Sequence, residues 1–197
     1  MEDTLSLQDT LLHRLNQLIP LNPQQRRELS QTVQTLSLSK GEVLLDMGQV
    51  SDHIYFVVDG VLRAVCDVDG REITRWFCFE GHFAAAYFSF VYRQPSEDKI
   101  VLATDAHLVS LSYGALQALS QHDAVWVDLN RRLLENYYTA LLKRVMAFQT
   151  QSAAERYCSL LAEHPDIEVK VPLGHLSSYL GMSQETLSRL RAKRKLI

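Results

Sequence analysis

The residues best suited to specific chemistry lie at the C-terminal end of the sequence, in the stretch LGMSQETLSRLRAKRKLI. Arg189 can donate two parallel hydrogen bonds to guanine, Glu185 can accept one from cytosine, and Gln184 can reach adenine or a phosphate. Five basic residues crowd this terminus, although the whole chain has a formal net charge of -3. Because nucleic acid is a polyanion, this concentration of positive charge predicts a DNA-contacting helix.

Two roles are expected along this helix. Leu187 and Leu190 supply its buried side, and the polar residues opposite them face outward. Contacts to base edges carry sequence information, whereas contacts to phosphates carry much of the affinity. The residues expected to read bases are Gln184, Glu185, Ser188 and Arg189, and those expected to hold the DNA backbone are Ser183, Thr186, Arg191, Lys193, Arg194 and Lys195.

A second helix must precede this one to position it. Leu176 and Leu180 form one apolar face, Gly181 breaks the helix, and Ser183 can cap the next by accepting from its free N–H groups. Small Ser177 allows the two helices to approach closely. The spacing predicts a helix-turn-helix. The alternative is an ordinary helical hairpin with a solvated basic tail.

Residues 116–149 contain no proline or glycine after Leu116 and predict one long helix with two apolar faces. One face consists of Trp126, Leu129, Leu133 and Tyr137. A helix with two apolar faces needs two partners. Either it is wedged inside one core, or one face packs on the domain before it and the other on a second subunit; the unbroken length favours a homodimer. The residues expected to form the dimer contact are Leu134, Tyr138, Leu141, Val145 and Phe148.

The segment 40–112 has a different texture, with short apolar or alternating runs separated by glycines. Strands of this kind predict a compact antiparallel roll or barrel. The sequence DVDG at 67–70 indicates a tight hairpin. Two short helices are expected before residue 36, and IEVKV at 167–171 is expected to be a short strand.

Composition narrows the class of protein further. Hydrophobic residues at 47% and charged residues at 22% are typical of a globular domain. Neither a secretory signal nor a membrane-spanning run stands out in the sequence. A cytoplasmic location and no membrane partner are therefore expected. Cys66, Cys78 and Cys158 are too scattered for a disulfide framework, a metal site or an iron–sulfur cluster. No phosphate-binding loop, nucleophile elbow or carboxylate pair indicates an enzyme.

The order of these parts resembles the Crp/Fnr family of bacterial transcription regulators over nearly the whole chain. The stretches KGEVLLDMGQVSDHIYFVVDGVLRAV and LGMSQETLSRLRAK carry the resemblance. It implies an α+β fold and a homodimer that binds a palindromic operator in double-stranded DNA, with RNA polymerase as a further partner. The implied domains are 1–115, N-terminal helices and a double-stranded β-roll of the cyclic-nucleotide-binding type; 116–149, the long dimerisation helix; and 150–197, the helix-turn-helix.

The sequence departs from that family in two places. Members that bind cyclic AMP hold its ribose with a Gly-Glu pair and its phosphate with an Arg-Ser pair. Alanines and Ser96-Glu97-Asp98 occupy the corresponding regions, so cyclic AMP is not expected to bind well, and another small effector, or none, is expected. The sequence also ends at Ile197, where many relatives continue into a β-hairpin wing. The residues assigned to the effector region are Ala85, Ala86, Ser96, Glu97 and Thr139.

One rival to DNA binding remains. The same parts would serve a cyclic-nucleotide or small-molecule sensor whose terminal helices dock on another protein.

Overall fold

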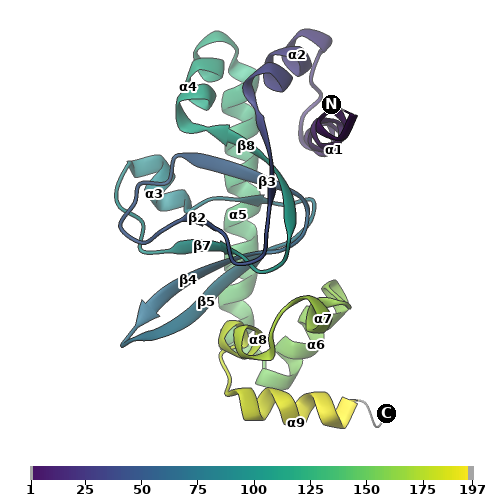
Figure 1. Ribbon diagram of the computed structural model, residues 1–197, viewed down its shortest axis with the longest axis vertical. Coiled ribbons are helices and arrows are strands. Elements are labelled where there is room, and N and C mark those ends of the chain that lie inside the picture. The colour runs from purple at the N-terminus through teal and green to yellow at the C-terminus, as the bar shows by residue number, and fades with distance from the viewer. Residues whose placement is uncertain (1, 195–197) are drawn as a thin grey trace.

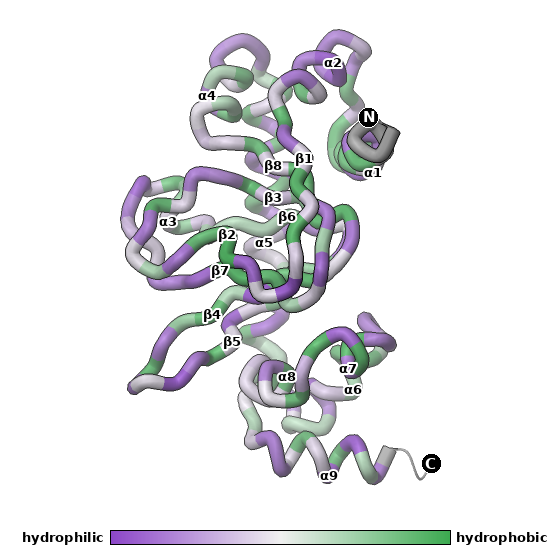
Figure 2. The backbone as a smooth tube through the Cα atoms, in the orientation of Figure 1, coloured by the Kyte–Doolittle hydropathy of each residue, from purple (hydrophilic) through white to green (hydrophobic). Residues whose placement is uncertain are grey.

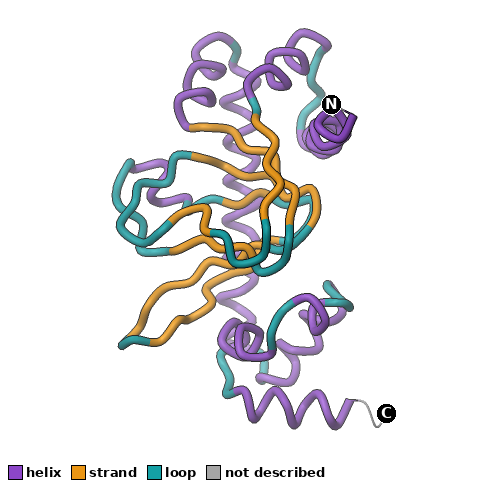
Figure 3. The backbone as a smooth tube through the Cα atoms, viewed as in Figure 1, coloured by secondary structure: helices purple, strands orange, loops and turns teal. Residues whose placement is uncertain are grey.

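The computed structural model describes residues 2–194, and its parts follow one another along a single long axis (Figure 1). Helices lie at both ends and strands fill the middle (Figure 3). One long helix, α5 (Ala124–Thr150), runs behind the strands and connects the two ends.

The N-terminal end is a pair of helices, α1 (Glu2–Leu18) and α2 (Pro23–Thr32), as the sequence predicts. Asn22 begins α2 with a capping box: its side chain accepts from the backbone N–H of Gln25, and the Gln25 side chain accepts from the N–H of Asn22. Leu15 and Leu29 are almost fully buried, so the apolar sides of both helices pack against the molecule.

The predicted β-roll is confirmed, and it consists of two antiparallel four-stranded sheets. Asp69 and Gly70 adopt positive φ angles in the hairpin between two of the strands, as the DVDG sequence predicts. Val57, Leu62 and Ile100 fill the space between the sheets with no exposed surface. The first sheet is ordered β1 (Gln34–Leu38), β8 (Ala106–Ser112), β3 (His53–Asp59), β6 (Phe83–Ala84), and the second β2 (Val43–Leu45), β7 (Lys99–Leu102), β4 (Leu62–Val68), β5 (Arg71–Cys78).

The sequence predicts one long helix over residues 116–149. The structure instead has two helices in this region. Helix α4 (Tyr113–His122) ends before Asp123, and α5 begins after it. Asp123 takes an extended conformation, and its carboxylate accepts from the N–H of Val125, which caps α5. The Gln25 side chain donates to the same carboxylate at 2.6 Å. The hydrogen bond from the Val125 N–H, and after it the one from Gln25, lower the pKa of Asp123.

The C-terminal unit contains α6 (Ala153–Glu163), α7 (Ile167–Lys170), α8 (Leu173–Leu180) and α9 (Gln184–Arg194). The expected strand at 167–171 is wrong, because this segment forms the short helix α7. Ile167 and Val171 lie one helical turn apart and are buried, whereas Val169 between them is 91% exposed. The alternating apolar residues therefore form a helix here and not a strand. Among the described residues, both sheets come from residues 34–112.

The C-terminal unit packs directly on the roll. Phe77 of the roll shares one apolar cluster with Tyr157 and Leu176 of the helices. The backbone N–H of Thr74 in β5 also donates to the Ser178 hydroxyl in α8 at 2.9 Å. These contacts set the direction in which α9 is presented.

Candidate nucleic-acid interface and sensor region

Helices α8 and α9 form the predicted helix-turn-helix. Gly181 ends α8 with φ 66°, and the Ser183 hydroxyl accepts from the backbone N–H of Thr186 at 3.1 Å. Leu187 of α9 has no exposed surface and packs against Leu176 and Leu180 of α8. The turn and the apolar contact together fix how α9 lies on α8.

The four residues predicted to read bases lie on the open side of α9. Gln184, Glu185, Ser188 and Arg189 are all exposed, and Figure 2 shows hydrophilic residues recurring along this helix at the lower end of the molecule. The Arg189 guanidinium lies 3.7 Å from the Glu185 carboxylate, one turn away. An ion pair this exposed is weak, so both side chains are free to turn toward a ligand.

The six residues predicted to hold phosphates fall into three groups. Ser183 and Thr186 face each other at the start of α9, with their hydroxyl oxygens 3.0 Å apart, and Lys193 is exposed. The side chain of Arg194 and the whole of Lys195 lie outside the described residues. Arg191 has a different environment.

Arg191 is half-buried and faces the protein. Its Nε lies 3.3 Å from Glu168 Oε1, and the same carboxylate accepts a hydrogen bond from the Tyr157 hydroxyl. This arrangement fastens α9 to α6 and α7, so Arg191 has a structural contact that the sequence did not indicate. Its role toward phosphate stays a prediction.

A clamp at the C-terminal end of α8 is a second feature that sequence reasoning missed. Arg156 donates to the Leu180 carbonyl from two nitrogens, at 2.9 and 3.1 Å, and Arg144 of α5 donates to the Tyr179 carbonyl at 3.1 Å. Positive charge is favourable at this negative end of a helix. The Phe148 ring lies beneath both guanidinium groups. The turn of the helix-turn-helix is therefore tied to the end of the long helix.

The two predicted apolar faces of α5 have different fates in the single chain. Trp126 and Leu129 of one face are buried against the N-terminal helices and the roll, and Leu133 is partly buried there, but Tyr137 further along the same face is 41% exposed. The other face is open along its length, and Tyr138 is 61% exposed. We call this face the α5 stripe: Leu134, Tyr138, Leu141, Val145 and Phe148.

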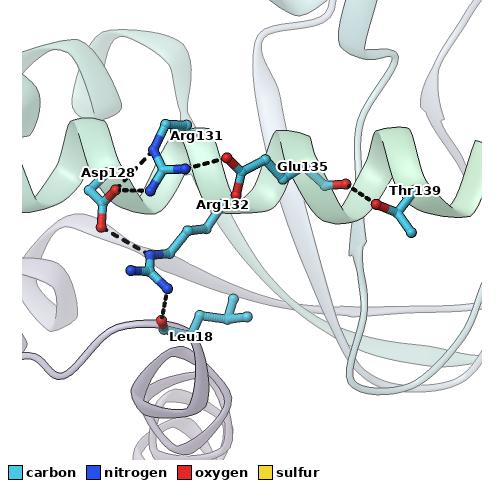
Figure 4. A network of polar contacts seen from close by, with 6 residues as sticks. All are labelled: Leu18, Asp128, Arg131, Arg132, Glu135 and Thr139. Atoms are coloured by element: carbon cyan, nitrogen blue, oxygen red, sulfur yellow. Dashed lines mark hydrogen bonds and ion pairs between the residues drawn. The ribbon is translucent and has the colours of Figure 1, made fainter.

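Arg131 interrupts the sequence pattern of that face, and the structure shows how its charge is accommodated. Its guanidinium pairs with Asp128 and Glu135 of the same helix (Figure 4). Arg132 also bonds to Asp128, at 2.9 Å, and donates to the Leu18 carbonyl at the end of α1. The cations of this part of α5 are thus neutralised within the chain.

The five residues predicted to contact an effector have different surroundings in the structure. Ala86 belongs to the core of the roll, and Ala85 packs in a separate apolar cluster. The buried Ser96 hydroxyl is used by its own turn, donating to the Asp98 carbonyl and accepting from the Asp98 N–H. Glu97 is exposed, and Thr139 donates to the carbonyl of Glu135 one turn back on α5 (Figure 4).

The basic side chains near this region are paired with carboxylates. Asp98 binds Arg75 at 3.0 Å, and burial raises the pKa of the Asp98 carboxyl although Arg75 opposes that shift. Arg93 binds Asp52 at 2.6 Å. An incoming cyclic phosphate would have to compete with these carboxylates.

An apolar cavity of about 30 Å³ lies elsewhere, between the N-terminal helices, the first sheet and α5. Leu15, Phe56, Val109 and Leu133 are among the side chains that line it. It is separate from the residues predicted to contact an effector.

Within residues 2–194, no group of three or more histidine, cysteine or acidic side chains is arranged to hold a metal ion. The same residues include no helix of the length and apolarity that crossing a bilayer requires. All three cysteines are free thiols, and burial raises the pKa of Cys78 to about 12, which makes that thiol unreactive.

Comparison with known proteins agrees with the β-roll described above. Residues 35–123 match the family described as the cyclic nucleotide-binding domain. The comparison with curated proteins finds no match.

Among solved structures, a protein from Eubacterium rectale ATCC 33656 assigned to the Crp/Fnr family of transcriptional regulators is similar with a TM-score of 0.70 and 20% identity, over 89% of this chain and 84% of that one. FixK2 from Bradyrhizobium japonicum is similar with a TM-score of 0.67 and 19% identity, over 82% and 83%. The c-di-GMP-responsive global regulator CLP from Xanthomonas campestris gives 0.62 and 17%, over 86% and 90%. At identities this low, the structural similarity establishes a shared fold and nothing more.

Proposed function

We propose that this chain, which joins a cyclic nucleotide-binding domain to the fold of the Crp/Fnr regulators, is a sequence-specific DNA-binding transcriptional regulator that acts as a homodimer. The observation that carries the proposal is α9 itself. Its apolar side is buried in the helix-turn-helix, and its polar side, with Gln184, Glu185 and Arg189, is exposed. This is the surface that a recognition helix presents to the major groove.

A dimer built on the α5 stripe would carry two such helices related by a two-fold axis. Two equivalent recognition helices read a palindromic operator, because the symmetry of the protein matches that of the DNA. The chain's net charge of -3 would repel DNA from the rest of the surface and favour the basic C-terminal end. RNA polymerase is the proposed protein partner of such a complex.

The proposal is tested by binding of the purified full-length chain to DNA fragments from upstream of its own gene. Fluorescence anisotropy should find a fragment that is bound much more tightly than a scrambled duplex of the same length, with an affinity that falls as salt rises. Equal affinity for all duplexes, or no binding, would contradict a sequence-specific regulator and favour a sensor that acts through protein contacts.

Arg189→Ala should relax specificity at one base pair of each half-site. Its guanidinium is exposed and only weakly paired, and the loss of a bidentate contact to a base costs about 1–3 kcal/mol of discrimination. The measurement is anisotropy against operators substituted singly at each position. The matched control is Lys193→Ala, which should weaken binding to every duplex alike and reduce the salt slope by about one. If Arg189→Ala behaves in the same way as the control, Arg189 contacts phosphate alone.

Cyclic AMP and cyclic GMP should bind weakly. The turn around Ser96 is closed by its own hydrogen bonds, Glu97 adds a negative charge, and Arg75 is held by Asp98. Isothermal titration calorimetry should show no saturable heat at micromolar nucleotide. Micromolar binding of either nucleotide would contradict this reading of the region.

A further inference from the structure

His175 lies at the contact between helix α8 and the roll. It precedes Ser178 by one turn of α8, and the Ser178 hydroxyl accepts from the backbone N–H of Thr74 in β5. The His175 ring is partly buried, and its Nδ1 atom is buried with no hydrogen-bond partner among the described residues. In a neutral imidazole one ring nitrogen carries no proton, and Nδ1 can be that nitrogen.

The charges of the roll around His175 disfavour a second cation at this place. Arg63 of β4 is 6% exposed, and its guanidinium binds Glu72 at 2.9 Å and the Thr74 hydroxyl at 3.3 Å. Burial lowers the pKa of His175 most, and Arg63 lowers it further. Glu72 raises this pKa, and Lys40 in the loop before β2 lowers it. Because Glu72 is already paired with Arg63, the surroundings as a whole favour the neutral ring.

We propose that protonation of His175 weakens the docking of the C-terminal unit on the roll. An imidazolium carries an N–H on both ring nitrogens, so the Nδ1–H would be a buried donor without an acceptor, near the buried guanidinium of Arg63. Movement of α8 away from β5 would give both groups water.

The direction of the pH dependence follows from the two states of the ring. Burial and Arg63 lower the pKa of His175 when the unit is docked, and a released ring returns toward the ordinary histidine pKa of 6.5. The docked state therefore binds fewer protons than the released state. Docking is fully favoured above the ordinary value and weakens as the pH falls below it.

His164 is a second histidine of the C-terminal unit that touches the roll. Its ring stacks on Phe79, with the ring centres 3.5 Å apart. Burial lowers the pKa of His164, but the face of an aromatic ring attracts a cation and opposes that effect. We therefore place the pH response at His175 and keep His164 unchanged in every variant.

Weaker docking would change how α9 is presented. Helix α8 carries α9 through the buried Leu187 contact, and β5 holds α8 through the bond from Thr74 to Ser178. Arg144 of α5 would still bind the Tyr179 carbonyl, so the unit would turn about this contact. The two recognition helices of the proposed dimer would then no longer be held at one spacing. This consequence rests on the proposed function, whereas the docking itself does not.

The amide of Thr74 measures docking directly, because its N–H donates to α8. NMR-detected hydrogen exchange of the full-length chain, corrected for the intrinsic pH dependence of exchange, gives its protection. Between about pH 7.5 and about pH 5.5 this protection should fall at least about 10-fold, the change expected from one unpaired buried donor. In His175→Gln, which has no titratable ring, it should stay constant. The Leu108 amide in the other sheet should keep its protection in both chains.

The matched control is His122→Gln, which removes an exposed histidine of α4 and should respond to pH as the parent chain does. NMR titration of the His175 ring in the parent chain needs no variant, and its pKa should lie below the ordinary histidine value. A ring that titrates at the ordinary value would overturn the inference. Constant Thr74 protection in the parent chain, or an equal fall in His175→Gln, would overturn it as well.

Operator affinity is measured by anisotropy at the same two pH values. It should fall further on acidification in the parent chain than in His175→Gln, and equal changes would overturn the link between docking and α9. Docking that responds to pH in a chain that binds no operator would overturn the proposed function and leave the inference about His175 intact.

Discussion

Leu141→Asp should convert the proposed homodimer into a monomer and weaken its binding to the proposed operator by about 100-fold or more. Leu141 lies in the middle of the α5 stripe and is exposed in the single chain, so aspartate costs the folded subunit little. In a dimer the same carboxylate would be buried at an apolar seam without a partner, which is strongly unfavourable. Two linked recognition helices gain about 10²- to 10⁴-fold over one, and the monomer forfeits that gain.

Sedimentation velocity measures the change in oligomeric state, and anisotropy on the same preparation measures the change in operator affinity. Val169→Asp is the matched control, because it places the same charge at an exposed valine away from the stripe. Thermal unfolding should show both variants folded. A Leu141→Asp chain that remains dimeric would contradict the assignment of the stripe to the dimer contact.

Gly181→Ala is the second change with a large expected effect, and it acts on the turn of the helix-turn-helix. Gly181 has φ 66°, a conformation that costs a residue with a Cβ about 1–2 kcal/mol. An added Cβ would also lie 2.7 Å from Cε1 of Phe148, so the ring would have to move. That ring supports the Arg144 and Arg156 clamp on α8. We therefore expect both a loss of stability and a marked loss of operator affinity.

Two comparisons separate the backbone cost from the displacement of the ring. Gly48→Ala shares the positive φ, 82°, but has nothing within 4 Å of the added Cβ, so it should show the backbone cost alone. In a double-mutant cycle, Phe148→Ala should remove part of the penalty of Gly181→Ala. Chemical denaturation gives the stability of each variant. Equal losses for Gly181→Ala and Gly48→Ala would contradict a role for the Phe148 contact.

The clamp gives Phe148 a second role beyond the dimer contact predicted for it. Its ring reaches Gly181 and two arginines of the same chain, although part of it remains exposed. The end of the long helix and the turn before α9 are thus one connected structure. A change in the packing of α5 has a direct physical route to α9, through a few van der Waals contacts and hydrogen bonds.

The sequence by itself determined the parts whose pattern is local. The glycine-separated runs of 40–112 indicated the β-roll, since the length of a strand and the type of a turn depend on residues that are close in sequence. Leu176, Leu180, Gly181 and Leu187 indicated the helix-turn-helix for the same reason, because caps and apolar spacing act within one or two helical turns. These elements are present in the structure.

Tertiary structure decided what depends on a partner far along the chain. The break at Asp123 is supported by Gln25, and the helix α7 at 167–170 forms because Ile167 and the C-cap residue Val171 are buried by the other C-terminal helices. Arg191 lies in the same basic stretch of sequence as its neighbours, but its ion pair with Glu168 turns its side chain toward the protein. Which apolar face of α5 stays open was likewise decided by the N-terminal helices and the roll, which cover Trp126 and Leu129 of the other. Periodicity shows that a face is apolar, whereas only packing selects the surface that covers it.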